Sequence, residues 1–240
     1  MKVPLLSEGS LPLVWKAWHS SAVVCFGDIH GHRAAAETAV TLAEDLGFRS
    51  VFLGDYVDRG PDSAGVLKVL MEAARRHPDW VFLLGNHDLM LMNILQGRRH
   101  AEGCDSRTFE ETLPTIAPEE HSTILQWLQA RPAFFRSGSC LFVHGGFTDS
   151  AVPIEEVPTE ELVWTYGIPE SWQGDTVVRG HSLVEQVERK PRDININTRC
   201  GFGGYLTGLL VNTEEGAPLH LWQIGEDGSL LPTPTINDSS

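Results

Sequence analysis

Short polar segments flanked by glycine recur at three points early in the chain, each directly after an apolar run. They occupy residues 27–31 (GDIHG), 54–60 (GDYVDRG) and 85–88 (GNHD), at intervals of about thirty residues. An apolar run followed by such a segment is typical of a strand and the loop that leaves it. Loops at the carboxyl ends of neighbouring strands in an α/β sheet converge on one crevice. The pattern therefore predicts that these polar residues meet at a single site.

The polar residues of these segments, together with two later histidines, are candidate metal ligands. Asp28 and His30 are separated by one residue, so in an extended segment both side chains point the same way. The Asp55 carboxylate has two oxygens and can bridge two cations. The other candidates also follow apolar runs and lie next to a glycine: Asn86, His144 and His181. Carboxylates, imidazoles and one amide suit Mn, Fe or Zn, and the lack of nearby thiolates argues against a structural zinc cage.

These segments resemble those of the phosphoprotein phosphatases, which are calcineurin-like metallophosphoesterases with the pattern GDxHG, GDxVDRG, GNH(D/E) and two later histidines. The chain carries all five elements within about residues 22–211, as prokaryotic serine/threonine phosphatases and diadenosine tetraphosphatases do. The resemblance implies an α/β sandwich of two packed mixed β-sheets flanked by helices. We expect a single domain over residues 1–240, with a core of about 22–225 and a flexible tail at 232–240.

The resemblance also implies roles for individual residues. One metal ion would be held by Asp28, His30 and Asp55, and a second by Asp55, Asn86, His144 and His181. His87 would be the general acid, oriented by Asp58, and Arg59 the clamp on the phosphate, beside Asn86. Two divalent cations about 3.5 to 4 Å apart lower the pKa of a bridging water, so that hydroxide can attack phosphorus at neutral pH. Mn is the expected metal, with Fe or Zn as alternatives.

The expected substrate is a phosphate monoester, and the named choice is phosphoserine or phosphothreonine in a protein. The alternative is a dinucleoside polyphosphate such as diadenosine tetraphosphate. Asp88 and the following residues 89–91 (LML) look like the diadenosine tetraphosphatase branch, whereas many protein phosphatases have Glu at this position. A third hypothesis is a catalytically silent scaffold. Its usual mark is the loss of ligands, and the sequence retains all of them.

One segment departs from the family pattern. Many prokaryotic members have Trp-x-Arg between the two late histidines, and that Arg is a second phosphate clamp; here residues 164–166 read WTY, so Tyr166 takes its place. No Arg or Lys occurs from residue 147 to residue 178. Arg179 is the nearest substitute in the sequence. A tyrosine hydroxyl can bond to phosphate without supplying charge, and its ring can stack on a nucleobase.

The composition of the chain argues against two kinds of partner, nucleic acids and membranes. The formal net charge of −14 disfavours a nucleic-acid polymer, because binding its phosphates requires a basic stripe. The sequence has no apolar stretch long enough for a membrane span and no secretory signal pattern, so we expect a soluble, cytoplasmic protein. The oligomeric state is left open.

Periodicity gives a coarse map of the elements. Strands at 22–27, 50–53 and 80–84 alternate with helices near 33–46 and 62–77, and a further helix runs from Asp88 to 97. Residues 98–118 are expected to form a loop, which is either mobile or a substrate-selecting flap. After a helix near 119–129 the predicted strands cover 132–143, 175–179, 194–197, 205–211 and 219–224.

Overall fold

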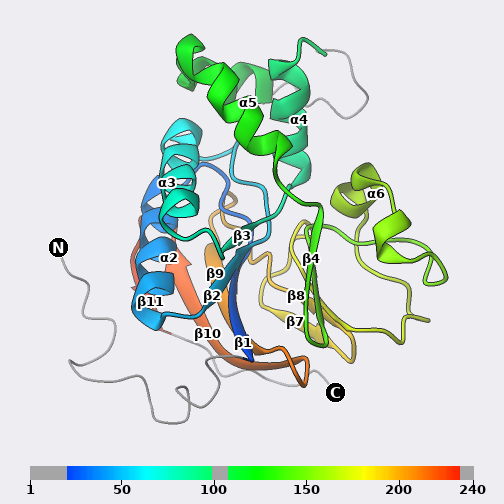
Figure 1. Cartoon of the computed structure of the whole chain (residues 1–240). Helices are drawn as coiled ribbons and strands as arrows, with labels where there is room; N and C mark the ends of the chain where they lie inside the picture. The colour runs from blue at the N-terminus through cyan, green and yellow to red at the C-terminus, as the bar shows by residue number, and fades with distance from the viewer. Residues whose placement is uncertain (1–20, 99–107, 233–240) are drawn as a thin grey trace.

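The computed structural model describes residues 21–98 and 108–232, and two β-sheets form its centre (Figure 1). The first sheet contains β1 (Ala22–Phe26), β2 (Arg49–Phe52), β3 (Val81–Phe82), β9 (Tyr205–Asn212), β10 (Ala217–Gly225) and β11 (Leu230–Leu231), in the spatial order β11-β10-β9-β1-β2-β3. The second contains β4 (Phe134–Ser137), β5 (Cys140–Val143), β6 (Thr176–Arg179), β7 (Glu188–Lys190) and β8 (Asp193–Asn195), in the order β4-β5-β6-β8-β7.

Helices lie outside the two sheets. The apolar faces of α2 (Arg33–Leu46) and α3 (Ser63–Arg76) pack on the first sheet, while α4 (Asn86–Leu95) and α5 (His121–Gln129) pack together at the top of Figure 1. A shorter helix, α6 (Thr159–Trp164), lies on the side of the second sheet. Its Leu162 joins an apolar cluster with strands β5 and β6.

Strand β1 shows how the layers are built. Val24 and Phe26 face the helices, whereas Val23 and Cys25 face the second sheet, where they meet Phe142 and other apolar residues. This alternation follows from the two-residue period of a strand, and it leaves β1 buried on both faces. Each sheet combines parallel and antiparallel pairs. The predicted sandwich of two mixed sheets flanked by helices is confirmed.

Parallel pairing brings the polar segments to one edge. Strands β1, β2 and β3 are parallel neighbours, and so are β5, β6 and β8. Their carboxyl ends therefore point the same way within each sheet. The loops that leave β1, β2, β3, β5 and β6 carry all the candidate ligands.

Several elements differ from the sequence-based map. Helix α4 begins at Asn86 rather than Asp88, because the Asp88 carboxylate accepts a 2.9 Å hydrogen bond from the backbone N–H of Gly85 and caps the first turn. Elements α6, β7 and β11 were not predicted.

The predicted loop at 98–118 also needs correction. Residues 99–107 lie outside the described residues, but Thr108–Thr112 form a turn of π-helix and Leu113–Thr115 a 3-10 turn. The predicted tail at 232–240 also lies outside the described residues, apart from residue 232. None of the helices in the described ranges has the length and apolar character needed to cross a bilayer.

Candidate metal centre and active site

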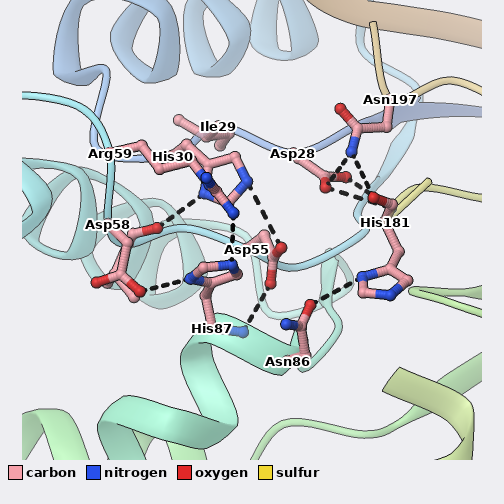
Figure 2. A network of polar contacts seen from close by, with 12 residues as sticks. Asp28, Ile29, His30, Asp55, Asp58, Arg59, Asn86, His87, His181 and Asn197 are labelled. Carbon is pink, nitrogen blue, oxygen red and sulfur yellow. Dashed lines mark hydrogen bonds and ion pairs between the residues drawn. The ribbon is translucent and has the colours of Figure 1, made fainter. Parts of the chain in front are cut away.

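The structure brings all six predicted metal ligands together, five of them buried and His181 partly exposed, and Figure 2 shows most of them. The Asp55 carboxylate lies at its middle, 3.6 Å from Nε2 of His30 and 3.4 Å from Nε2 of His144. The side-chain oxygen of Asn86 lies 3.0 Å from Nε2 of His144 and 2.9 Å from Nδ1 of His181. Five loops that are distant in sequence therefore present their polar atoms to a common point.

The backbone at the site is held in an uncommon conformation. Six described residues other than glycine have a positive φ, and five of them belong to this site: His30, Asp55, Asp58, Arg59 and His181, with φ between 47° and 70°. Each such residue costs about 1 to 3 kcal/mol, so the conformation persists only because the surrounding structure imposes it. Strain concentrated in this way marks a functional site. The backbones of the second and third segments also approach closely, and this explains Gly85, since a Cβ there would clash with Asp55.

The imidazole orientations fit metal ligation. Nδ1 of His30 lies 3.0 Å from the carbonyl oxygen of Val57, and Nδ1 of His144 lies 2.9 Å from that of Leu53. Bonds of this kind fix the tautomer with the proton on Nδ1 and leave Nε2 free to ligate. Nε2 of His181 is buried and has no hydrogen-bond partner among the described residues. A cation at this point could bind Nε2 of His30 and Nε2 of His144, whereas His181 turns its Nδ1 toward the other ligands, 2.9 Å from the side-chain oxygen of Asn86.

Ligand atoms form two groups that share Asp55. In each, the atoms lie within 4.8 Å of one another: His30, Asp55 and His87 in one group, and Asp55, His144 and His181 in the other. This donor set suits two divalent cations with Asp55 between them. Asp28 belongs to neither group. Its carboxylate accepts hydrogen bonds from the backbone N–H of His181 and, at 2.6 Å, from Nδ2 of Asn197.

Burial and mutual charge shift the acidity of these groups. Burial raises the pKa of Asp28 to about 7. Burial also opposes ionisation of Asp55, but the imidazoles of His144, His87 and His30 together outweigh this effect and hold the pKa of Asp55 well below its usual range. Reciprocally, burial lowers the pKa of His144, but the carboxylates of Asp55, Asp28 and Asp88, with Asp55 contributing most, together raise it to about 9. Asp55 and His144 thus hold each other charged, whereas burial lowers the pKa of His30 to about 3 and that of His181 to about 4, so that both imidazoles are in the neutral form that binds metals.

His87 belongs to a chain of hydrogen bonds behind the ligands. Its Nδ1 lies 2.5 Å from Oδ2 of Asp58, and the hydroxyl of Thr112 donates to the other Asp58 oxygen, also at 2.5 Å. Burial lowers the pKa of His87, yet the carboxylates of Asp55 and Asp58 reverse this and raise it. Nε2 of His87 faces Nη2 of Arg59 at 3.2 Å. The structure thus places Asp58 against the His87 ring, in the position that the predicted orienting role requires.

A pocket of about 250 Å³ opens above this group. It is lined by His30, Asp55, Arg59, Asn86, His87, Met90, Trp164, Tyr166, His181, Leu183 and Phe202. The Arg59 guanidinium lies 4.1 Å from the centroid of the Phe202 ring, and its Nε is buried without a hydrogen-bond partner among the described residues. Because Arg59 lines the pocket, an anion bound there can interact with its guanidinium. Arg59 is the only Arg or Lys among the described residues that line it.

The structure does not bring Arg179 to the pocket. The guanidinium is buried and pairs in bidentate fashion with Asp193, at 2.7 and 3.0 Å, and it also donates to the Ser182 hydroxyl. We therefore do not retain Arg179 as the replacement for the second phosphate clamp. Tyr166 does line the pocket, with its ring centroid 4.4 Å from that of His181.

Three residues with supporting contacts were not predicted from the sequence. Asn197 links two ligands, because its amide donates to the Asp28 carboxylate and, at 3.1 Å, to the carbonyl of His181. Thr112 holds Asp58 from within a segment predicted to be a loop. Asp88 accepts hydrogen bonds of 2.8 to 2.9 Å from three backbone N–H groups in the second and third segments. Of these three residues, Asp88 alone lies in one of the first three motifs, where Asp in place of Glu serves only to distinguish branches of the family.

The contacts of Asp88 predict a large effect on stability. Asp88→Ala leaves three buried N–H groups without an acceptor, and each unsatisfied group costs about 1 to 3 kcal/mol. We expect the free energy of unfolding to fall by at least about 3 kcal/mol, measured by urea denaturation. Asp62→Ala, which removes an N-cap on α3, is a matched control expected to cost about 1 kcal/mol. Equal losses in the two variants would contradict this assignment of Asp88.

Comparison with known proteins agrees with this geometry. A family model described as calcineurin-like phosphoesterase matches residues 21–200, and the chain belongs to this family. Symmetrical bis(5'-nucleosyl)-tetraphosphatases are among its relatives. The protein from Methylococcus capsulatus is 29% identical over 171 residues, which are 69% of this chain and 50% of the relative. That from Burkholderia pseudomallei is 35% identical over 141 residues, 57% of this chain and 47% of the relative. The chain thus spans about half the length of these relatives.

Solved structures share the fold. A protein assigned as a diadenosine tetraphosphatase superimposes with a TM-score of 0.63 at 23% identity, over 85% of this chain and 94% of that one. A cold-active protein-tyrosine phosphatase from a Shewanella species gives 0.61 at 18% identity, over 88% of this chain and 80% of that one. The names of these two proteins imply different substrates, so the shared fold does not identify the substrate of this chain.

Proposed function

We propose that the chain hydrolyses dinucleoside tetraphosphates in a reaction that depends on two divalent metal ions. The family makes it a phosphoesterase, and the relatives named symmetrical bis(5'-nucleosyl)-tetraphosphatase favour this substrate over the phosphoprotein expected first from the sequence. The serine/threonine phosphatase reading is not confirmed by these relatives. Symmetrical cleavage would break the central phosphoanhydride and release two nucleoside diphosphates.

Arg59, the only Arg or Lys among the described residues that line the pocket, carries this proposal. A phosphate monoester bears close to two negative charges at neutral pH, and the usual second clamp for it is absent, since Arg179 is paired with Asp193. An internal phosphate of a dinucleoside tetraphosphate is bonded through oxygen on both sides and bears one charge. The whole substrate carries four such charges, but the one phosphate that Arg59 would contact has a single charge, which one Arg in the described lining can match.

Each residue has a role in this proposal. Asp28, His30, Asp55, Asn86, His144 and His181 would hold the metal ions. Two cations would supply an activated water and compensate the phosphate charge; manganese, iron and zinc all suit these ligands. Arg59 would grip the phosphate through its planar fork. His87, held by Asp58, would protonate the departing oxygen, with its ring set by the bond from Thr112 to Asp58.

A comparison of substrates tests the proposal. The Mn²⁺-loaded protein is assayed on diadenosine tetraphosphate, a phosphoserine peptide and AMP, and the products are separated by chromatography. We expect kcat/KM to be highest for diadenosine tetraphosphate, with ADP as the sole nucleotide product. A higher kcat/KM on the phosphopeptide would contradict the proposal and indicate that the chain is a protein phosphatase. Loss of all activity after chelation and its return with Mn²⁺ would support the metal requirement.

Tyr166 provides a second test of the charge argument. Tyr166→Arg adds a guanidinium to the pocket wall, where many prokaryotic phosphatases carry one, and we expect the KM for phosphate monoesters to fall by about tenfold, as one added charged hydrogen bond of about 1.5 kcal/mol would give. The measurement is steady-state kinetics on nitrophenyl phosphate. Tyr166→Lys is the matched control, since it adds charge without a bidentate fork and is expected to lower KM less. An unchanged KM in both variants would refute the missing-clamp argument.

A further inference from the structure

We propose that Tyr166, Leu183 and Phe202 form a nucleobase subsite at the mouth of the catalytic pocket. The subsite would take the planar ring of a nucleoside joined to the phosphate held by Arg59. This inference rests on the proposed function and adds the part of the protein that recognises the nucleoside.

The exposed apolar side chains of the described residues gather at this one place. Tyr166, Leu183 and Phe202 are the large hydrophobic residues that remain exposed there, at 75%, 47% and 38%. All three line the same pocket. Scattered exposed hydrophobic residues need no explanation, but their convergence around a polar cleft marks a binding surface.

The pocket is divided by chemistry. Six of its lining residues belong to the metal and phosphate groups described above, and the other five are Met90, Trp164, Tyr166, Leu183 and Phe202. The polar groups lie together around Asp55, whereas the five others supply apolar and aromatic surface. A ligand that fills the pocket must therefore carry a charged phosphate next to an apolar, preferably flat, group.

The two aromatic rings are held beside the residues that would meet the phosphate. The Tyr166 ring covers His181, with an interplanar angle of 41°. Because three-quarters of Tyr166 is exposed, the side turned away from His181 is open to solvent. Phe202 lies against the Arg59 guanidinium. A base bound at this rim would therefore stay close to the phosphate that Arg59 holds.

The loop that carries Phe202, residues 200–203, is held in place before any ligand binds. Oε1 of Glu226 accepts hydrogen bonds from the backbone N–H groups of Gly201 and Gly203, at 2.8 and 3.0 Å, on either side of Phe202. Cys200, next in the loop, is buried and donates to the Ile29 carbonyl. A preformed wall loses little conformational freedom on binding, which favours affinity.

A nucleobase fits this surface better than a peptide does. The backbone next to a phosphorylated residue carries N–H and C=O groups, and each would be left unsatisfied against an apolar wall. Outside the metal and phosphate groups, the only N–H or O–H groups on side chains of the described lining are the Tyr166 hydroxyl and the Trp164 indole N–H. A base has apolar faces and keeps its polar edge in solvent, and stacking on an aromatic ring contributes about 1 to 3 kcal/mol per base.

Calorimetric binding of two diphosphates to the Mn²⁺-loaded protein tests the subsite. ADP is compared with methyl diphosphate, which carries the same diphosphate without a nucleoside. We expect the protein to bind ADP about 5- to 150-fold more tightly, as stacking of one base would give. Tyr166→Leu, which keeps apolar area and removes the flat ring, is expected to reduce this ratio at least about fivefold, and Tyr166→Phe to retain it. Phe135→Leu, a half-buried ring of β4 that is not part of the pocket lining, is the control and is expected to retain it.

The outcomes separate the subsite from the proposed reaction. Equal affinity of the unmodified protein for ADP and methyl diphosphate would overturn the subsite, whatever the protein hydrolyses. A tenfold loss of phosphopeptide binding in Tyr166→Leu with an unchanged ADP ratio would also overturn it, and would assign the rim to peptides. A preference for ADP together with no hydrolysis of diadenosine tetraphosphate would support the subsite and refute only the proposed reaction. Circular dichroism of each variant checks that it is folded.

Discussion

Asp55→Asn is expected to reduce kcat/KM by more than about a thousandfold and to lower the content of both metal ions. Asp55 is the residue common to the two groups of ligand atoms, and its Oδ1 also accepts the backbone N–H of His87 at 2.9 Å. The amide keeps the shape but loses the negative charge and one ligating oxygen. Since a catalytic metal contributes several kcal/mol of charge stabilisation, and each 1.36 kcal/mol is about tenfold in rate, the loss of both ions gives this magnitude.

The measurement is kinetics on diadenosine tetraphosphate together with metal analysis of the dialysed protein. Asp45→Asn, at an exposed position on α2, makes the same chemical change away from the site and is expected to leave rate and metal content unchanged. If Asp55→Asn bound both ions with unmodified rates, the bridging role would be wrong. Full activity of the unmodified protein after complete removal of metal would refute the metal requirement itself.

The sheet and the ligand loops could be predicted because local signals agreed with the tertiary structure. Each of the first three segments joins an apolar run, a glycine and a polar residue, and parallel pairing of β1, β2 and β3 then brings them to the same edge. His144 and His181 follow the same rule after β5 and β6. The ligand set rests on this repetition and needed no knowledge of side-chain contacts.

Arg179 shows where sequence proximity misleads. It lies two residues before His181, and alternation along a strand would place both side chains on one face. The chain leaves the strand at Gly180, and His181 has a φ of 61°, so alternation does not extend across this point. The partner of Arg179 is Asp193, fourteen residues away on the neighbouring strand β8. A buried pair of this kind depends on strand register, which the sequence alone did not give.

Thr112 shows a second kind of omission. Its hydroxyl bonds to Asp58 across 54 residues of sequence, from a π-helical turn in a stretch without clear periodicity. A hydroxyl residue in such a stretch has no local feature that distinguishes it from a turn former. The contact exists only because the segment after residue 107 packs against α4. Contacts behind the site were therefore less predictable than the ligands in it.

His87→Asn is expected to slow hydrolysis in proportion to how poorly the leaving group departs. An alkoxide such as that of serine needs a proton in the transition state, so loss of a general acid costs about 10²- to 10⁴-fold in kcat. The terminal phosphate of departing ADP, with a pKa of about 6, leaves without full protonation, and so does nitrophenolate. We therefore expect the loss on diadenosine tetraphosphate and nitrophenyl phosphate to be smaller, below about tenfold, than the loss on a phosphoserine peptide.

Metal analysis of the same variant decides between two roles for the imidazole. Nδ1 of His87 is bonded to Asp58, which favours the role of proton donor. Yet the ring also has a nitrogen within 4.8 Å of ligand atoms of His30 and Asp55, so that one cation could bind all three residues. If His87 is the acid, the variant retains both ions and shows the dependence on leaving group. If metal content falls by half and all substrates slow equally, His87 is a ligand instead. Asp58→Asn serves as the companion change, because it removes the charge that orients His87. If His87 is the acid, this variant should reproduce the leaving-group dependence and keep both ions; if His87 is a ligand, it should weaken metal binding.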